Sequence, residues 1–189
     1  REVPVSALCD IRDRAAQILF SRGLLARVEI PQQRITEGRV TFEVIEAYLA
    51  AVRVTGDIGP GQAKVEDYIE LLRGMRPFDL NRAQRYLLLA SDVPGVRLSA
   101  TLRPSGAGRG AVDLEVNVGR DPFGAAANIS NLGSHEMGPW GAIVRADLNS
   151  FTALGERTSV ILYSTADARE QKVIQAIEEV RFGSEGLLG

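Results

Sequence analysis

The fold of this chain is decided by residues 80–118, which have the sequence LNRAQRYLLLASDVPGVRLSATLRPSGAGRGAVDLEVNV. The first part predicts a helix that opens at Asn81, because Gln84 stands three residues later, as in a capping box. The helix is expected to stop at the break Asp92–Gly95, where a proline and a glycine stand together. The stretch therefore begins with one helix.

Two segments after the break alternate apolar and polar residues. They are residues 96–103 and 111–118. A period of two residues predicts strands that bury one face. The connection 104–110 is rich in glycine, which favours a hairpin. The whole stretch thus predicts a helix followed by a β-hairpin.

The same helix and hairpin pattern occurs about 72 residues earlier. An internal repeat of this length indicates two copies of one small domain. The second copy also has a preceding strand near residues 51–55 and a helix that carries an apolar stripe at Val65, Tyr68, Ile69 and Leu72. The first copy lacks this front half, so the chain is expected to begin inside its first domain.

The earlier copy predicts three elements. They are a helix over Ser6–Arg22 and strands over Leu25–Ile30 and Arg39–Ile45. The apolar stripe of the helix consists of Leu8, Ile11, Ala15, Ile18 and Leu19.

The last third of the chain leaves two alternatives open. Ala142, Val144, Ala146 and Leu148 alternate with Ile143, Arg145, Asp147 and Asn149, and a further strand is expected over Thr158–Thr165. Both a soluble two-layer domain and a membrane-barrel strand show this pattern. Residues 173–180 have the spacing of an amphipathic helix, which leaves their structure undecided between helix and strand.

Composition excludes several classes of protein. The chain has 189 residues, 45% hydrophobic, 24% charged, with a net charge of −2. Nucleic-acid binding is disfavoured because Lys and Arg do not cluster. No apolar run approaches the roughly 18 to 20 residues of a membrane helix, and no segment has the pattern of a signal peptide. Cys9 stands alone, so no internal disulfide is possible.

Candidate catalytic motifs are weak. Gly106, Gly108 and Gly110 resemble a phosphate-binding loop, but a strand follows them where such a loop needs a helix. His135 is the only histidine, and no partner residue of a known catalytic motif stands near it. The sequence therefore predicts no enzyme.

Several segments carry a family resemblance. They are the lead Pro77–Asn81 into the second helix, the strand Gly110–Val118, and the matches at Gln32–Gly38, Asn131–Ser134, Gly138–Trp140 and Asn149–Glu156. Together with the repeat order, they make nearly the whole chain resemble the outer-membrane transporters of two-partner secretion, the haemolysin secretion and activation family. The chain departs from that family at Glu156, where an Asp is more usual.

This resemblance implies an α+β fold. Tandem POTRA-like β-α-α-β-β units, the first one incomplete, would be followed by β-strands of a truncated outer-membrane β-barrel. The expected segments are 1–47 for the incomplete first POTRA domain, 48–120 for the second, and 121–189 for the first barrel strands.

The resemblance also implies a function. Such transporters hold POTRA domains in the periplasm and a barrel in the bacterial outer membrane, and they export a large partner protein with its own secretion domain. The expected partners are this secreted protein and, for the full-length protein, outer-membrane lipids. No nucleotide, metal or other cofactor is expected. The alternative is a POTRA-bearing assembly factor that binds barrel precursors.

Client recognition is expected at an exposed sheet edge, where an unfolded chain can add itself as a strand. In the POTRA topology this edge is Val96–Arg103, and the expected client-binding residues are Tyr86, Arg97, Ser99, Thr101 and Arg103. The alternative for each is an ordinary solvated side chain. Replacing Ser99 by Pro is expected to weaken client binding and leave the fold mostly intact.

The predicted barrel strands carry two further expectations. The polar alternation implies the pore-facing residues Arg145, Asp147 and Asn149. The apolar face of the same strand would be an exposed patch in water, so the chain is expected to self-associate or to fold that face onto its own POTRA domains.

Overall fold

The computed structural model describes residues 6–35, 38–134, 136, 138–167, 171–182 and 186–188. The chain divides into two compact units. The first comprises Arg1–Val54, Ile69–Leu87 and Ala100–Val116, and the second comprises Thr55–Tyr68, Leu88–Ser99 and Asn117–Gly189. This division cuts across a three-stranded sheet and therefore does not test the predicted segments 1–47, 48–120 and 121–189.

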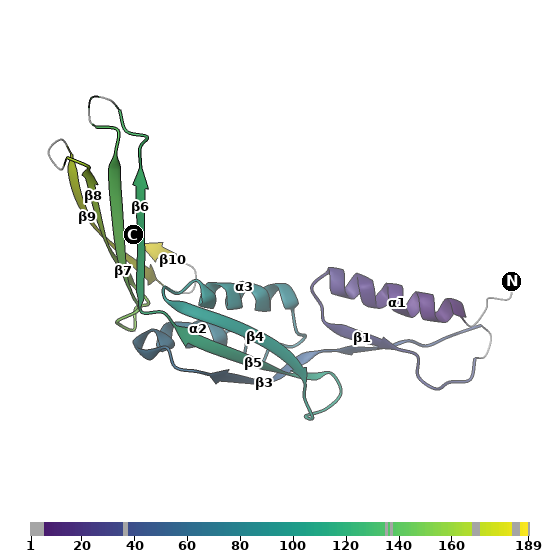
Figure 1. Ribbon diagram of the computed structural model, residues 1–189. Coiled ribbons are helices and arrows are strands. Elements are labelled where there is room, and N and C mark those ends of the chain that lie inside the picture. Colours follow the sequence, from purple (N-terminus) through teal and green to yellow (C-terminus); the bar gives the residue numbers. More distant parts are fainter. Residues whose placement is uncertain are drawn as a thin grey trace. The chain divides into compact units, whose positions relative to one another are not determined.

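The chain starts with a helix and a short hairpin. Helix α1 (Ser6–Ser21) lies along strand β1 (Ala26–Glu29), as Figure 1 shows. Strand β1 pairs antiparallel with β2 (Glu43–Glu46). Val28 is buried, whereas Ile11 and Ile18 on the apolar stripe of α1 are exposed. The helix thus presents uncovered apolar side chains.

Strand β2 is shorter than the predicted strand Arg39–Ile45. The side-chain amide of Gln33 accepts a hydrogen bond from the Thr41 N–H at 2.7 Å and donates one to the Thr41 carbonyl at 2.9 Å. A side chain therefore satisfies backbone groups that a longer β-ladder would have used. The pairing with β1 begins only at Glu43.

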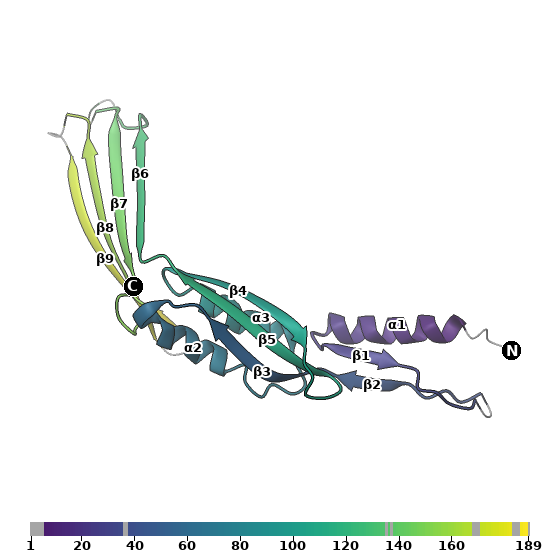
Figure 2. The ribbon, with the colours of Figure 1, turned by 60° about the horizontal axis from the view of Figure 1, so that its bottom comes forward.

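A complete β-α-α-β-β arrangement follows. Its elements are β3 (Tyr48–Thr55), the 3₁₀ turn η1 (Gly59–Gly61), α2 (Gln62–Glu70), α3 (Leu80–Ser91), β4 (Val96–Pro104) and β5 (Ala111–Arg120). The sheet order is β3-β5-β4, which puts β4 at an edge (Figure 2). Because β1-β2 and β3-β5-β4 are separate sheets, the predicted tandem arrangement is confirmed.

Helix α2 and the turn that follows it bury the predicted apolar residues. Val65, Tyr68, Ile69 and Leu72 are at most 2% exposed. Strand β5 contributes Leu114, Val116 and Val118 to the core. The helical spacing of three and four residues and the strand spacing of two residues therefore both predict core residues correctly.

The predicted start of α3 was wrong by two residues. Asp79, not Asn81, is the N-cap, because its Oδ1 accepts hydrogen bonds from the N–H of Asn81 at 2.9 Å and of Arg82 at 3.1 Å. Asn81 lies inside the helix, which starts at Leu80. A carboxylate at the N-cap also interacts favourably with the helix dipole.

The C-terminal strands form an antiparallel meander. They are β6 (Phe123–Ser130), β7 (Gly141–Asn149), β8 (Arg157–Thr165), β9 (Lys172–Phe182) and β10 (Gly186–Leu188), in the sheet order β10-β9-β8-β7-β6. Figure 2 shows β6 to β9 side by side. Residues 173–180 are strand rather than helix, because residues 173–179 pair along β8 and Val180 pairs with Leu188 of β10. None of the described helices is long and apolar enough to cross a membrane.

Candidate functional site

The edge strand β4 exposes the four residues predicted to contact a client. Arg97, Ser99, Thr101 and Arg103 are all exposed, and the alternate residues Val96, Leu98 and Leu102 are half-buried. Arg97 and Ser99 also line an open groove of about 270 Å³, together with Leu98, Asn117, Val118 and Gly119. One end of the strand thus combines an open edge with a shallow groove.

The two arginines of β4 form ion pairs that the sequence did not indicate. Arg97 Nε lies 2.9 Å from Asp121 Oδ2, and Arg103 Nε lies 2.7 Å from Glu115 Oε2. Both guanidinium groups remain largely exposed. Exposed pairs of this kind are weak, so a client carboxylate can compete for either arginine.

The hydrogen-bond phase of β4 changes the role of Ser99. Asp121 donates its N–H to the Gly95 carbonyl at 2.7 Å, and Ser105 donates its N–H to the Ala111 carbonyl at 2.9 Å. Along an antiparallel pair such bonds recur at every second residue. The odd-numbered residues, Ser99 included, therefore point their N–H groups toward β5, and Ala100 points its N–H outward.

This phase corrects the expectation that a proline at Ser99 would spare the fold. A proline there removes a group that faces the neighbouring strand, whereas edge prolines are tolerated only where the N–H side faces solvent. Ala100, which is exposed, is the position where that condition holds.

Tyr86, the remaining predicted client-binding residue, lies on α3. Its ring is half-buried, and the Arg82 guanidinium lies 5.8 Å from the ring centroid. Tyr86 is not among the residues that line the β4 groove.

The sheet β6 to β9 exposes its apolar face. The register places Val144 between Ala127 and Leu162, so these three side chains share that face. Ile129 is 72% exposed, Ile174 79% and Val144 48%. In a water-soluble two-layer fold this face would be covered, whereas a transmembrane strand presents such a face to lipid.

The opposite face of this sheet carries a polar network. Arg145 donates to Asp147 Oδ1 at 2.7 Å and to Ser159 Oγ at 3.1 Å, and Ser159 donates to Asp147. The Asp147 side chain is only 18% exposed. Arg145 and Asp147 are thus brought together as the alternation predicts. Asn149, the third residue of the predicted pore-facing set, is buried and donates to the Asp121 carbonyl at 3.1 Å.

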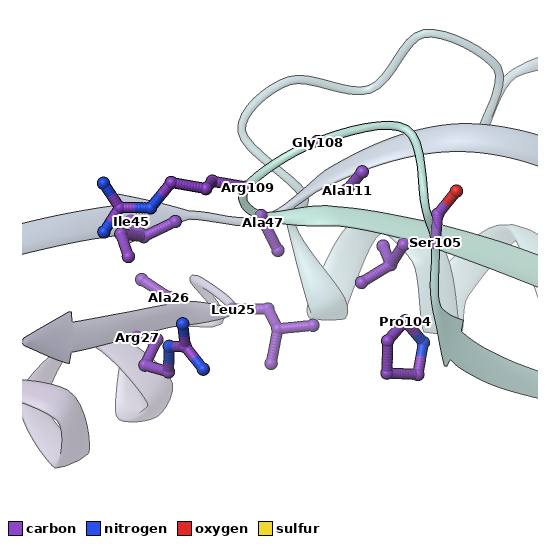
Figure 3. A pocket seen from close by; sticks show the side chains of 12 residues that line it. Leu25, Ala26, Arg27, Ile45, Ala47, Pro104, Ser105, Gly108, Arg109 and Ala111 are labelled. Carbon is purple, nitrogen blue, oxygen red and sulfur yellow. The ribbon is translucent and has the colours of Figure 1, made fainter.

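An open pocket of about 350 Å³ lies where the β1-β2 hairpin meets the β4-β5 connection. Figure 3 shows Arg27 and Arg109 at one end and Pro104 and Ser105 at the other. Ala47, which also lines the pocket, connects β2 to β3. Its N–H donates to the Leu25 carbonyl at 2.8 Å, and its carbonyl accepts from the Phe78 N–H at 2.7 Å.

Arg109 ties the two sheets together at this pocket. It bonds to Glu43 at 3.0 Å and to Glu29 at 2.8 Å, and these carboxylates, Glu43 above all, raise the pKa of its guanidinium. Within the described residues, no cluster of His, Cys, Asp and Glu could hold a metal ion. His135 lies outside the described residues.

These features define a class of fold. The chain is α+β, with POTRA-like units followed by antiparallel strands of a partial barrel sheet. Solved structures of this class include CdiB from Escherichia coli, with a TM-score of 0.73 and 16% identity over 96% of this chain. CdiB from Acinetobacter baumannii follows, with a TM-score of 0.64 and 14% identity over 94% of this chain.

The chain spans about a third, 34%, of the length of either CdiB chain. A structure of BamA from Haemophilus ducreyi that lacks POTRA domains 1–3 has a TM-score of only 0.44 and 12% identity. It covers 86% of this chain and 32% of its own. No protein-family model matches the sequence, and no curated protein does.

Proposed function

We propose that this chain belongs to an outer-membrane polypeptide transporter of two-partner secretion. One observation carries the proposal: the sheet β6 to β9 leaves Ile129, Val144 and Ile174 exposed while Ser159 on the opposite face is 1% exposed. An apolar face turned outward and a polar face turned inward suit a wall between lipid and a watery pore.

The fold neighbours agree with this role. CdiB is a two-partner secretion transporter, and the E. coli structure matches 96% of the chain. Under the proposal the POTRA-like units lie in the periplasm and the strands from Phe123 onward lie in the outer membrane. Arg145 and Asp147 then face the pore, where water solvates their charges and lipid does not contact them.

The POTRA-like edge strand β4 supplies the recognition step. An unfolded client adds itself as a strand along β4, with main-chain hydrogen bonds giving affinity and the exposed Arg97, Thr101 and Arg103 giving selectivity. The client is a secreted partner protein. The role is one of binding and passage rather than catalysis, and no cofactor takes part.

Two neighbouring positions on β9 test the membrane orientation. Ile174 lies on the apolar face, and Gln175 lies on the polar face. In a background in which Cys9 and any other cysteine of the full-length protein are replaced by Ser, single cysteines at these positions are exposed to a water-soluble maleimide in outer membranes that contain that protein. We expect Gln175→Cys to react and Ile174→Cys to be protected, because lipid excludes the reagent.

The control is the same pair in urea, where both cysteines should react equally. Equal reaction in the membrane would overturn the orientation. The alternative role is that of an assembly factor for outer-membrane barrels, and the identity of the proteins bound to β4 distinguishes the two roles. Capture of one secreted protein encoded beside the gene supports transport, whereas capture of a range of barrel precursors supports assembly.

A further inference from the structure

The turn Asp92–Gly95, which separates α3 from β4, accepts hydrogen bonds from the C-terminal part of the chain at three of its four residues. Hydrogen bonds join Arg181 to the Asp92 carbonyl, the Ser150 hydroxyl to the Pro94 carbonyl, and the Asp121 N–H to the Gly95 carbonyl. Val93 lies close to Gly155, where an added Cβ would be 3.1 Å from Val93 Cγ1. A turn that is bonded at three residues and closely packed at the fourth has few ways to move.

Ser150 is the centre of these contacts. Its Oγ donates to the Pro94 carbonyl at 2.6 Å, and the residue is 2% exposed. Its φ of 50° is left-handed, which is uncommon for a residue other than glycine. Gly61, the last residue of η1, lies so close that a Cβ there would sit 2.8 Å from the Ser150 Cβ.

Gly95 shows the same close fit on the other side of the turn. A Cβ at this position would lie 2.6 Å from the Asn149 Cβ and 2.5 Å from the Asp121 carbonyl oxygen. Its φ of 75° also favours glycine. The buried Asn149 donates its own N–H to the Pro122 carbonyl at 2.8 Å, which fixes the end of β7 against the linker between β5 and β6.

Glu156 holds the β7–β8 turn, Ser150–Glu156, in shape. Its carboxylate accepts hydrogen bonds from the N–H and the hydroxyl of Thr152, both at 2.7 Å. Its carbonyl accepts the N–H of Ser150 at 2.8 Å. Ser150 is thereby presented to Pro94 by a turn that is closed on itself.

We infer that the turns Asp92–Gly95 and Ser150–Glu156 form a rigid joint that holds the start of the edge strand to the base of β7 and β8. Strand β4 begins at Val96, directly after this joint. The consequence rests on the proposed function: the start of β4, Val96–Ser99, lies in the same compact unit as β7 and β8, and a client bound there meets those strands in one fixed orientation because the joint does not hinge.

The joint is tested by amide hydrogen exchange on the chain in detergent micelles. Gly61→Ala places a methyl group against Ser150 and should open the joint. We expect exchange at the N–H groups of Asp121 and Asn149 to rise on the order of tenfold. A steric clash, or a buried carbonyl that loses its hydrogen bond, destabilises the closed joint and shifts its opening equilibrium by about that factor. The N–H of Ser105, directly after the far end of β4, should keep its protection.

Gly106→Ala is the matched control, because nothing lies within 4 Å of a Cβ at that position. It should leave all three amides unchanged. Unchanged exchange at Asp121 and Asn149 in Gly61→Ala would overturn the joint. If exchange rises at all three amides in Gly61→Ala, the same measurement is made on Ser150→Ala, which removes only one hydroxyl. Its exchange should rise at Asp121 and Asn149 and not at Ser105, and any other result would overturn the joint. No client enters the measurement, so its outcome is independent of the proposed transport role.

Discussion

The backbone N–H of Ser105 donates to the carbonyl of Ala111 at 2.9 Å, and this bond sets the phase of the whole edge strand. Counting back in steps of two brings the Ser99 N–H to the β5 side and the Ala100 N–H to the open side. Two neighbouring residues of one strand thus have opposite roles: one holds the sheet and the other is free to bind a client.

Ala100→Pro should therefore weaken client binding and spare the fold. It removes one outward N–H, and the loss of about 1 kcal/mol with the added ring should lower affinity for the partner's secretion domain roughly tenfold. Titration calorimetry measures the affinity, and circular dichroism measures Tm. Ser99→Pro is the matched variant: it should lower Tm clearly. The reverse ranking of the two Tm values would show that the phase is wrong.

Arg97→Ala and Arg103→Ala should reduce client affinity with little effect on stability. Their exposed ion pairs contribute about 0–1 kcal/mol to folding, whereas both arginines stand on the strand that a client would join. We expect slower association and a weaker dependence of that rate on salt, measured by stopped-flow. Arg53→Ala on β3, whose guanidinium is also exposed and lies 4.0 Å from Asp113, is the control and should bind client normally.

Glu156→Gln should destabilise the β7–β8 turn in a pH-dependent way. Burial raises the pKa of this carboxyl, but hydrogen bonds from Thr152 and from the backbone outweigh burial and bring the pKa below its ordinary value of 4.5. The folded protein therefore stabilises the charged carboxylate of Glu156 relative to the protonated carboxyl. Its stabilisation is complete above pH 4.5 and is lost as the pH falls through the folded-state pKa.

We expect the variant to lose about 1 kcal/mol at pH 7, because a neutral acceptor replaces a charged one. Thermal unfolding at a series of pH values measures this loss. The gap between variant and parent should close at low pH. Glu66→Gln, an exposed carboxyl on α2, should show no gap at any pH. A gap that persists at low pH would mean that the charge of Glu156 is irrelevant.

The exposed apolar face of β6 to β9 should make the chain self-associate in water. Val144, Leu162 and Ile174 are each at least 47% exposed, and apolar patches of this kind are rare on soluble monomers. Analytical ultracentrifugation should show oligomers in buffer and a monomer in detergent micelles. A monomer at all concentrations in buffer would contradict the lipid-facing role of these residues.

Local patterns in the sequence predicted most of the helices and strands but not the tertiary contacts between them. The spacing of Val65, Tyr68, Ile69 and Leu72 predicted a buried helix face, and alternation predicted β4, β5 and β7, because both periods follow from backbone geometry alone. Residues 173–180 have helical spacing but form a strand, since pairing with β8 overrides a local preference.

The joint could not be predicted, because its contacts join residues far apart in the chain. Ser150 and Pro94 are 56 residues apart, and nothing in either local sequence points to the other. Gln33 shortened β2 by bonding to Thr41, which is also a side-chain effect that alternation does not reveal. The segment Asn149–Glu156 was singled out by resemblance, and the structure gives Ser150 and Glu156 within it a physical role.

Photo-crosslinking during export tests the central claim most directly. A photoreactive amino acid is placed at Thr101, Gln175, Ile174 or Glu66 of the full-length protein, in cells that export the secreted protein encoded beside the gene. We predict that the client is captured from Thr101 on the edge strand and from Gln175 on the polar face, but not from Ile174 on the apolar face or Glu66 on α2. Capture from Ile174 or Glu66 without capture from Thr101 would contradict the proposed path.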